Sequence, residues 1–363
     1  MQVQLVDPSA FTPPYDHALA AALARAGARV ELVTSRFLYG PVPAADGYRV
    51  TEHFYRRSAR RGRDARGRLA LKLAEHVPDM ARYRRVAEQA DLVHYQWLTA
   101  PPLDLLLLPP KRPRVLTAHD ILPREPRPGQ VAATRRLVRR MDAVVAHSEH
   151  GAGRIRDELG VEAGRVRVIP HGAFDHLTRL NEERPLPDEL AAAEVPVVLI
   201  FGLLRPYKGI DVLLEAWRAV TADAELWIVG MPRMDIDPLR RAADERVRFV
   251  PRFVSDPEIP AFFRRADLVV LPYREIDQSG VLYTALAFGK PMVLSAAGGF
   301  PEVGAGRLVP PGDPDPLARA LRELLEDPGE RERLGEQARA RAAERYSWDH
   351  AAELTLELYR ELL

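Results

Sequence analysis

The segment Pro196–Val220 constrains the fold of this chain more strongly than any other. Its first part, Val197–Phe201, is an uninterrupted apolar run, which is typical of a strand buried on both faces of a parallel sheet. Gly202 breaks that run. Apolar side chains then recur at helical spacing, at Ile210, Leu213, Leu214 and Trp217. The segment therefore predicts a strand–loop–helix unit, the repeating element of an α/β protein.

The loop inside this segment carries two cationic side chains, Arg205 and Lys208. A helix N-terminus offers unpaired N–H groups with partial positive charge, and cationic side chains add full charges to it. The arrangement favours a phosphate site. The simpler alternative is that both residues are ordinary surface cations of an α/β unit.

Composition narrows the class of protein. The chain has 363 residues, enough for two domains, with 47% hydrophobic and 28% charged residues, as in globular proteins. It has no cysteine, which excludes disulfides and thiolate sites. The N-terminal MQVQLVDPSAF reads as a first strand rather than a signal peptide, and no apolar run approaches the ~18 residues of a membrane span. We expect a cytoplasmic protein.

Charge is distributed unevenly along the chain. Residues 1–175 contain 28 Lys and Arg against 19 Asp and Glu, whereas the remainder has 24 against 32. Within Arg56–Lys72 there are eight basic residues and one acidic residue. Such a stretch is either a solvated surface or a patch that attracts anionic lipid headgroups or an acidic acceptor, which would place the protein at the inner membrane face. A nucleic-acid partner is disfavoured, because no aromatic residues interleave the charges and no recognisable nucleic-acid module accompanies them.

Apolar runs predict two successive series of strands separated by loops and helices. The first series is Gln2–Val6, Val30–Val33, Asp91–Tyr95, Val115–His119, Val144–Ser148 and Val166–Ile169; the second is Val197–Phe201, Glu225–Val229, Val247–Val250, Leu268–Leu271 and Pro291–Leu294. Alternation of this kind predicts an α/β fold with two Rossmann-like, doubly wound parallel sheets. A ligand is then expected in a central cleft that both domains face.

Domain limits follow from the same pattern. We expect an acceptor-side domain over 1–175, a polar linker with Pro185 and Pro187 over 176–195, and a donor domain over 196–345. The terminal segment 346–363 is expected to be a helix that packs back onto the first domain. Proline-rich stretches at Pro101–Pro113 and Pro123–Pro128 are expected to be ordered loops.

A series of motifs in fixed order resembles the retaining glycosyltransferases of the GT-B fold, family 4, also called glycosyltransferase group 1. The motifs are TAHD at 117–120, HSEH at 147–150, VIPHGAF at 168–174, FGLLRPYKGIDVLLEAW at 201–217, LWIVG at 226–230, VPRFVSDPEIPAFFRRADLVVLPY at 250–273, QSGVLYTALAFGKPMVLSAAGGFPEV at 278–303 and GRLVPPGDPDPLARAL at 306–321. Each motif is weak alone, but their order and spacing over nearly the whole chain are specific.

The resemblance implies a role for several residues at the phosphates of a nucleotide-sugar donor. Arg205 and Lys208 match the pair that grips the diphosphate. Backbone amides that face the same phosphates come from Ser279, Gly280 and Val281, and Gly202 belongs to the same donor-contact set.

The resemblance also implies contacts to the nucleobase and the sugar. The segment Arg252–Ser255, with Phe253 and Val254, matches the loop along the nucleobase. His119 matches a histidine that reaches the donor sugar near the reacting carbon; the alternative is a packed histidine that ends a strand.

The sequence departs from the family pattern at two places, and each departure changes the expected contacts. The family's Glu-x7-Glu pair is replaced by Ile276 and Thr284, so Glu275 and Asp277 are candidates for the first contact and Thr284 for the ribose. The first loop lacks the usual glycine pair and reads FTPPYDHALA. Candidates there for acceptor or phosphate contact are Tyr15, Asp16 and His17, although Asp16 alternatively caps the following helix.

The resemblance thus implies transfer of a hexosyl-type sugar from a UDP or GDP sugar to an acceptor hydroxyl, with retention. No clustered His and Asp ligand set is evident in the sequence, so we expect no metal and no cofactor besides the donor. Two alternatives remain: a nucleotide-sugar epimerase or phosphorylase on the same fold, and a non-catalytic nucleotide-sugar binding protein. Donor turnover without acceptor, or a requirement for free phosphate, would separate them. The acceptor could be a saccharide, a lipid-linked saccharide or a small molecule.

Overall fold

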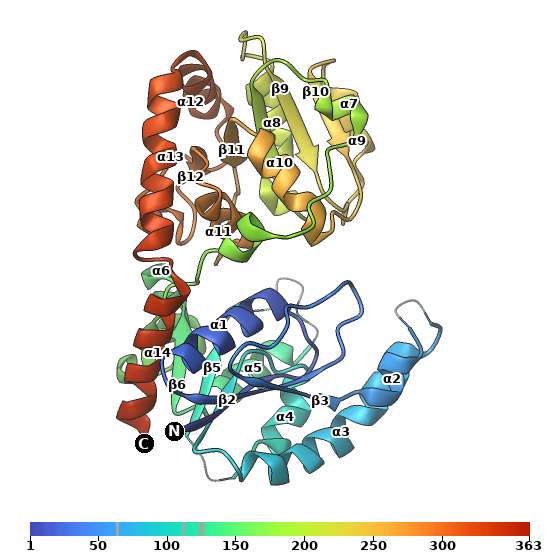
Figure 1. Ribbon diagram of the computed structural model, residues 1–363, viewed down its shortest axis with the longest axis vertical. Helices are drawn as coiled ribbons and strands as arrows, with labels where there is room; N and C mark the ends of the chain where they lie inside the picture. Colours follow the sequence, from blue (N-terminus) through green and yellow to red (C-terminus); the bar gives the residue numbers. More distant parts are fainter. Residues whose placement is uncertain (63–64, 111–112, 123–125, 127) are drawn as a thin grey trace. The chain divides into compact units, whose positions relative to one another are not determined.

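The computed structural model describes residues 1–62, 65–110, 113–122, 126 and 128–363 (Figure 1). The chain divides into two compact units. The first comprises Met1–Gly172 and Ser347–Leu363, and the second comprises Ala173–Tyr346. The C-terminal helix is therefore counted with the first unit, and residues 176–195 are counted with the second.

The first unit is built on a seven-stranded sheet in the order β3-β2-β1-β4-β5-β6-β7, with every neighbouring pair parallel. The strands are β1 (Gln2–Asp7), β2 (Arg29–Ser35), β3 (Arg49–Phe54), β4 (Leu92–Tyr95), β5 (Arg114–Thr117), β6 (Ala143–Ala146) and β7 (Val166–Val168). The chain adds strands on one side of β1 and then on the other. Ligands in such sheets bind at the carboxyl ends of the strands, next to this switch point.

Helices flank this sheet (Figure 1). They are α1 (Pro13–Arg25), α2 (Arg56–Arg60), α3 (Arg68–Ala87), α4 (Pro101–Leu107), α5 (Gln130–Val138), α6 (Glu149–Leu159) and α14 (Trp348–Leu362), with a short 3-10 helix η1 (Ala163–Arg165). Helix α14 contacts α1, and α4 contacts both α3 and α5. Side chains from β1, β2, β4, β5 and β6 share one core cluster with side chains of α3, α5 and α6.

The second unit contains a six-stranded sheet in the order β10-β9-β8-β11-β12-β13, also parallel throughout. Its strands are β8 (Val197–Phe201), β9 (Glu225–Val229), β10 (Val247–Val250), β11 (Leu268–Leu271), β12 (Met292–Ser295) and β13 (Arg307–Val309). Its helices are α7 (Asp188–Ala191), α8 (Ile210–Trp217), α9 (Asp237–Ala242), α10 (Ile259–Arg265), α11 (Gly280–Ala287), α12 (Pro314–Glu326) and α13 (Pro328–Ala343). The switch point lies between β8 and β11.

Strand β8 shows why this sheet needs helices on both faces. Val198 and Ile200 join a core cluster with residues of α8 and α12, whereas Val197 and Leu199 join a second cluster with residues of α10 and α11. Successive side chains of a strand point to opposite faces, so an apolar run buries both faces. The predicted fold class, two doubly wound parallel-sheet α/β domains, is therefore confirmed.

Some elements were missed or wrongly assigned by the sequence-based prediction. β3 is an edge strand, RVTEHF, with mostly half-exposed side chains, so it lacks the apolar run of its neighbours. Pro101–Leu107 is a helix rather than the expected loop. The first N–H groups of a helix have no partner inside it, so prolines at these positions remove no helical hydrogen bond. Residues 63–64 of the basic stretch, 111–112 of the first proline-rich stretch, and 123–125 and 127 of the second lie outside the described residues.

Across the described ranges, we find no helix that is both long and apolar enough to span a bilayer.

Candidate active site

The loop that follows β8 brings three of the predicted donor-contact residues to one point. Gly202 has a positive φ of 95°, and a Cβ atom placed on it would lie 2.9 Å from Lys208 Nζ and 3.1 Å from Val281 Cγ2. Any side chain at Gly202 would therefore displace the ammonium group. Glycine is needed here both for the backbone conformation and for the close approach.

The two cations of this loop have different surroundings. Lys208 is buried; its Nζ donates to the Phe201 carbonyl over 2.8 Å and lies 5.2 Å from the centre of the Tyr273 ring. Arg205 is half-buried, and its guanidinium makes no hydrogen bond or ion pair with any residue in the described part of the chain. The structure thus fixes the ammonium in place and leaves the guanidinium able to bind a ligand.

Contacts between the loops after β8 and β11 hold this arrangement. A Cβ on Gly209 (φ 65°) would lie 2.1 Å from the Pro272 carbonyl oxygen, so the two backbones touch there. Arg274 donates to both carboxylate oxygens of Asp211 over 2.9 and 2.5 Å, and to the Pro206 carbonyl over 3.0 Å. Since β8 and β11 are neighbours at the switch point, their carboxyl-end loops form the expected position of a ligand site.

Helix α11 begins at this same edge of the sheet. Ser279 is its N-cap residue, but within the described ranges the serine hydroxyl accepts no amide of the first turn and lies 3.4 Å from the Tyr273 hydroxyl instead. The first N–H groups of α11 therefore have no side-chain cap, and Gly280 is exposed. Such a terminus suits an anion.

Thr284 lies one turn into α11, where its hydroxyl donates to the Gly280 carbonyl over 2.9 Å. The side chain is buried, and its oxygen keeps a lone pair to accept a further hydrogen bond. Before this helix, Glu275 is exposed, Asp277 is half-buried and Ile276 is buried. The predicted replacement of the first glutamate by Glu275 or Asp277 stays a prediction.

The loop after β10 contains the predicted nucleobase contacts. Phe253 is 44% exposed, whereas Val254 is buried. Arg252 pairs with Glu258 over 2.7 Å, and Glu258 also accepts from the Ser255 amide and hydroxyl. Burial would raise the pKa of Glu258, but these hydrogen bonds outweigh it and lower that pKa to about 2. Glu258 is thus an ionised anchor that fixes the loop and leaves the Phe253 ring exposed.

In the first unit, Tyr15 lies at the centre of an aromatic cluster at the carboxyl edge of the sheet. Its ring centre is 4.6 Å from that of His119, 4.8 Å from His171 and 5.1 Å from Trp348. His119 is buried, and its ring is stacked on that of Trp97 with 5.2 Å between the ring centres. His119 Nδ1 lies 3.4 Å from His147 Nε2. His119 is therefore a packed histidine beyond the end of β5; its contact with a donor sugar remains a prediction.

Burial keeps these imidazoles neutral. Desolvation lowers the pKa of His147 to about 4 and that of His94 to about 3, and it moves the pKa values of His119 and His171 well below 6.5. Each charged neighbour would repel the next, which lowers the pKa of His119 further. At neutral pH the cluster can donate and accept hydrogen bonds but carries no charge.

Asp16 is buried next to a second carboxyl group, that of Asp7. Desolvation and the Asp7 charge raise the pKa of Asp16 well above its usual value, so Asp16 keeps its proton and shares it with Asp7. Asp7 in turn accepts the amides of Ser9, Phe11 and Thr12 over 3.1, 2.5 and 3.2 Å. Asp7, rather than Asp16, therefore organises the turn into α1. The capping alternative for Asp16 is wrong, since Thr12 is the N-cap residue and Asp16 lies inside the first turn.

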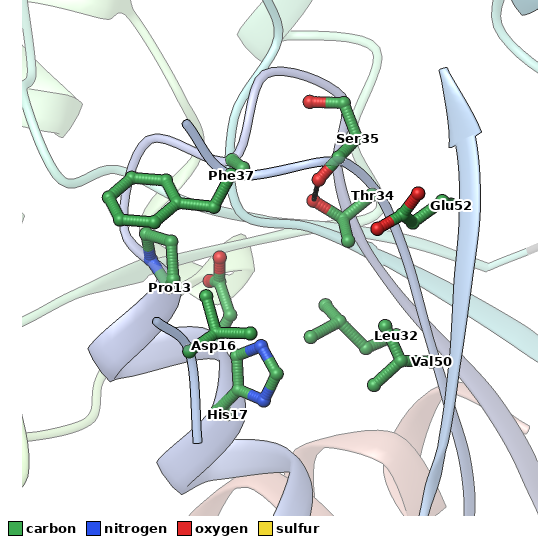
Figure 2. A pocket seen from close by; sticks show the side chains of 11 residues that line it. Pro13, Asp16, His17, Leu32, Thr34, Ser35, Phe37, Val50 and Glu52 are labelled. Carbon is green, nitrogen blue, oxygen red and sulfur yellow. Dashed lines mark hydrogen bonds between the residues drawn. The ribbon is translucent and has the colours of Figure 1, made fainter. Parts of the chain in front are cut away.

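A small pocket of about 40 Å³ lies beside this pair, between α1, β2 and β3 (Figure 2). Its lining combines polar groups of Asp16, His17, Thr34, Ser35 and Glu52 with apolar side chains that include Phe37. His17 Nδ1 is 2.6 Å from the Tyr48 hydroxyl, and burial lowers the His17 pKa to about 4. Asp16 and His17 thus face one pocket, whereas Tyr15 faces the histidine cluster.

Comparison with known proteins identifies the family. Residues 195–327 match the family described as "Glycosyl transferases group 1", and residues 15–173 match "Glycosyltransferase Family 4". D-inositol 3-phosphate glycosyltransferase of Salinispora arenicola is 30% identical over 318 residues, which cover 76% of this chain and 70% of that protein. The chain belongs to glycosyltransferase family 4.

Other comparisons agree with this assignment. The enzyme of the same name from Kineococcus radiotolerans is 29% identical over 396 residues, covering 94% of this chain and 88% of the relative. For several other relatives the matched part spans 56% to 65% of their own length. The crystal structure of Anabaena Alr3699/HepE in complex with UDP-glucose has a TM-score of 0.73 at 21% identity, covering 100% of both chains. The fold is that of the GT-B glycosyltransferases.

Several residues that surround Tyr15 and His119 were not predicted from the sequence. Gln96 is fully buried, lies 3.3 Å from His119 Nε2 through its Oε1, and has an Nε2 without a hydrogen-bond partner in the described residues. Trp97, His171 and Trp348 complete the cluster around Tyr15. The sequence did contain a signal for this cluster, because polar residues directly after β4, β5, β6 and β7 must meet at one edge of a parallel sheet.

Among the described residues, no three His, Asp or Glu side chains form a group that could hold a metal ion.

Proposed function

We propose that this family 4 glycosyltransferase moves a hexosyl-type sugar from a nucleoside diphosphate to an acceptor hydroxyl with retention of configuration. The observation that carries the proposal is the pairing of a fixed ammonium, Lys208, with the unpartnered guanidinium of Arg205. Both belong to the loop at the switch point of the second sheet, beside the uncapped N-terminus of α11. Such a set of donors suits a diphosphate.

The proposed mechanism rests on electrostatics. As the bond between the anomeric carbon and the phosphate oxygen breaks, negative charge grows on the leaving diphosphate. Arg205, Lys208 and the first amides of α11 stabilise this charge, and a single well-placed donor lowers such a barrier by about 3–4 kcal/mol. These groups would supply the stabilisation that a metal ion provides elsewhere, so we propose metal-independent transfer.

Retention follows if the acceptor attacks the face from which the diphosphate departs. The acceptor oxygen forms the new bond to the anomeric carbon, the old carbon–oxygen bond breaks, and the acceptor proton passes to the leaving phosphate oxygen. The neutral histidines around Tyr15 are suited to hydrogen bonds with an uncharged sugar, which supports the proposed role of His119.

The donor base and the acceptor are further parts of the proposal. The exposed Phe253 ring offers a stacking surface for a nucleobase, and Thr284 can accept a hydrogen bond from a ribose hydroxyl. Because the HepE structure contains UDP-glucose, uridine diphosphate sugars are the first donors to test. We place acceptor contacts at the pocket of Asp16 and His17, whose neutral acid and imidazole favour hydroxyl groups.

Calorimetric titration of the intact protein with UDP and GDP, followed by assays of UDP-glucose and GDP-mannose turnover, tests the proposal. We expect Arg205→Ala to lower turnover about 10²–10³-fold, with an unchanged melting temperature, because the guanidinium has no partner in the described protein. The matched control is Arg319→Ala, an exposed arginine on α12. Wild-type turnover in Arg205→Ala would refute the proposed site.

The same assays separate the alternatives. Product formed only with free phosphate would indicate a phosphorylase, and donor interconverted without any acceptor would indicate an epimerase. Tight nucleotide binding with no turnover for any acceptor would indicate a binding protein.

A further inference from the structure

Helix α3 presents an apolar face that no part of its own unit covers. Leu69 is 66% exposed, Leu73 52% and Val77 43%. Neighbouring exposed positions of the helix are also apolar, namely Ala70, Ala74, Pro78 and Ala81. Because these positions recur at helical spacing, they form one continuous stripe along the helix. Continuous exposed apolar surface of this kind marks an interaction site more often than scattered exposed residues do.

The opposite face of α3 is packed against the domain. His76, Asp79, Met80 and Tyr83 are buried, and Met80 and Tyr83 belong to the main core cluster of the first unit. The helix is therefore anchored, and its apolar stripe is not a surface exposed by fraying of the helix.

Acidic side chains near the stripe are occupied by the protein itself. Glu75 accepts the amides of Arg57 and Ser58 over 2.8 and 2.9 Å, which ties α2 to α3. Asp79 is buried, where it accepts the Tyr55 amide and pairs with Arg82. Both carboxylates are therefore engaged by groups of the first unit.

Basic side chains on α2, directly after it and shortly before α3 are exposed. Arg57, Arg60, Arg61 and Arg66 form no ion pair within the described ranges, and α2 packs against α3. Lys72 differs, because its ammonium lies over the Tyr55 ring at 4.8 Å and its pKa is lowered by burial. The cations available to a partner are thus these arginines, beside the N-terminal half of the apolar stripe.

We propose that the α2–α3 surface docks on a bilayer that contains anionic lipids, with Leu69, Leu73 and Val77 in the interfacial region and the arginines at the headgroups. An apolar helix face bordered by cations, whose nearby carboxylates are already bonded within the unit, matches this occupant, since acyl chains contact the stripe and lipid phosphates bind the guanidinium groups. A protein partner would have to offer both an apolar groove and acidic residues.

Co-sedimentation of the full chain with vesicles tests the inference. We expect binding to vesicles of phosphatidylglycerol and phosphatidylcholine in equal parts, and little binding to phosphatidylcholine alone. Leu69→Gln with Leu73→Gln should lower partitioning about tenfold or more, and Arg60→Gln with Arg61→Gln should lower it about fivefold for each charge. Glutamine preserves helix propensity, so both variants should melt as the wild type does.

Matched controls on the second unit are Leu308→Gln, which replaces a side chain 44% exposed, and Arg319→Gln. Both should bind vesicles like the wild type. Equal binding of the wild type and the leucine variant, or no binding to either kind of vesicle, would overturn the inference. So would a wild-type dimer that the leucine variant converts to a monomer, because the stripe would then be an interface between two copies. Nucleotide binding in calorimetry should be unchanged in every variant, which separates this result from failure of the proposed function.

Discussion

Both units have polar groups at the carboxyl ends of similar sheets, but these groups differ in whether the protein itself bonds to them. In the second unit the guanidinium of Arg205 and the amides of α11 remain without side-chain partners among the described residues. In the first unit the polar groups are buried and bonded to each other: Asp7 with Asp16, and His119 with His147. The first arrangement suits recognition of a charged ligand, and the second suits a neutral one.

The difference also concerns stability. Of the ten histidines, His176 alone lies in the second unit. Groups without protein partners can be removed at little structural cost, whereas buried and mutually bonded groups are part of what holds the fold together. Substitutions in the two sites should therefore separate function from stability.

Acid should produce the largest contrast. The unfolded chain protonates its histidines near pH 6.5, whereas His94 and His147 resist protonation in the folded state until about pH 3 and 4. Their folded-state pKa values are depressed, so the stability they contribute is present above pH 6.5 and is lost as the pH falls toward 4. Each of these histidines lowers the free energy of unfolding by about 1.4 kcal/mol for every pH unit that the pH falls within that window.

Hydrogen exchange followed by mass spectrometry at pH 7.5 and pH 5 measures this loss in each unit. Peptides from residues 1–172 should lose protection at pH 5, while those from 173–346 change little. Equal loss in both units would contradict the contrast.

Asp7→Ala should cause the next largest effect, now by mutation. The change removes the acceptor of three backbone amides and leaves the Asp16 proton without its partner. We expect a loss of about 3 kcal/mol in the free energy of unfolding, measured by urea titration. Nucleotide binding, which we assign to the second unit, should survive under conditions where the variant is folded.

The milder Asp7→Asn serves as the control for that experiment, because an amide oxygen can still accept backbone N–H groups. An Asp7→Ala protein as stable as the wild type would mean that the turn does not depend on this carboxylate.

Thr284→Val should give the smallest effect. The hydroxyl already donates to the Gly280 carbonyl, so a ribose can use only its lone pair, and UDP affinity should fall by less than about tenfold. Calorimetry measures this change, and Thr284→Ser, which keeps the hydroxyl, should bind as the wild type. A loss as large as that of Arg205→Ala would make Thr284 a principal ligand of the nucleotide.

Much of the fold could be predicted from the sequence, because central parallel strands are continuous apolar runs. Four of the five predicted strands of the second unit, for example Val197–Phe201, have the predicted limits. Edge strand β3 could not be found in this way, because most of its side chains are partly or fully exposed and its sequence mixes polar and apolar residues. A strand could therefore be predicted where both of its faces are buried, and the intrinsic strand propensity of its residues mattered less.

The candidate site was partly predictable for a different reason. Gly202, Lys208 and Val281 follow two strands that the doubly wound order makes neighbours, and the structure brings these three residues together. The Asp7–Asp16 pair could not be predicted, because a shared proton depends on burial and on the path of the turn. The apolar stripe of α3 was equally hidden, since only the packing of the opposite face shows which side of the helix is left uncovered.

The passage of the chain out of the first unit and back again has a consequence for synthesis. Trp348 packs on Gly172 and Tyr15, and the Tyr359 hydroxyl is 2.6 Å from His94, so residues 347–363 complete a core begun by the first strands. On the ribosome, the second unit has all of its residues before the first does. The half of the protein that is translated first is thus the last to be finished, and its unfilled surface around Tyr15 must stay soluble while 174 intervening residues, 173–346, emerge.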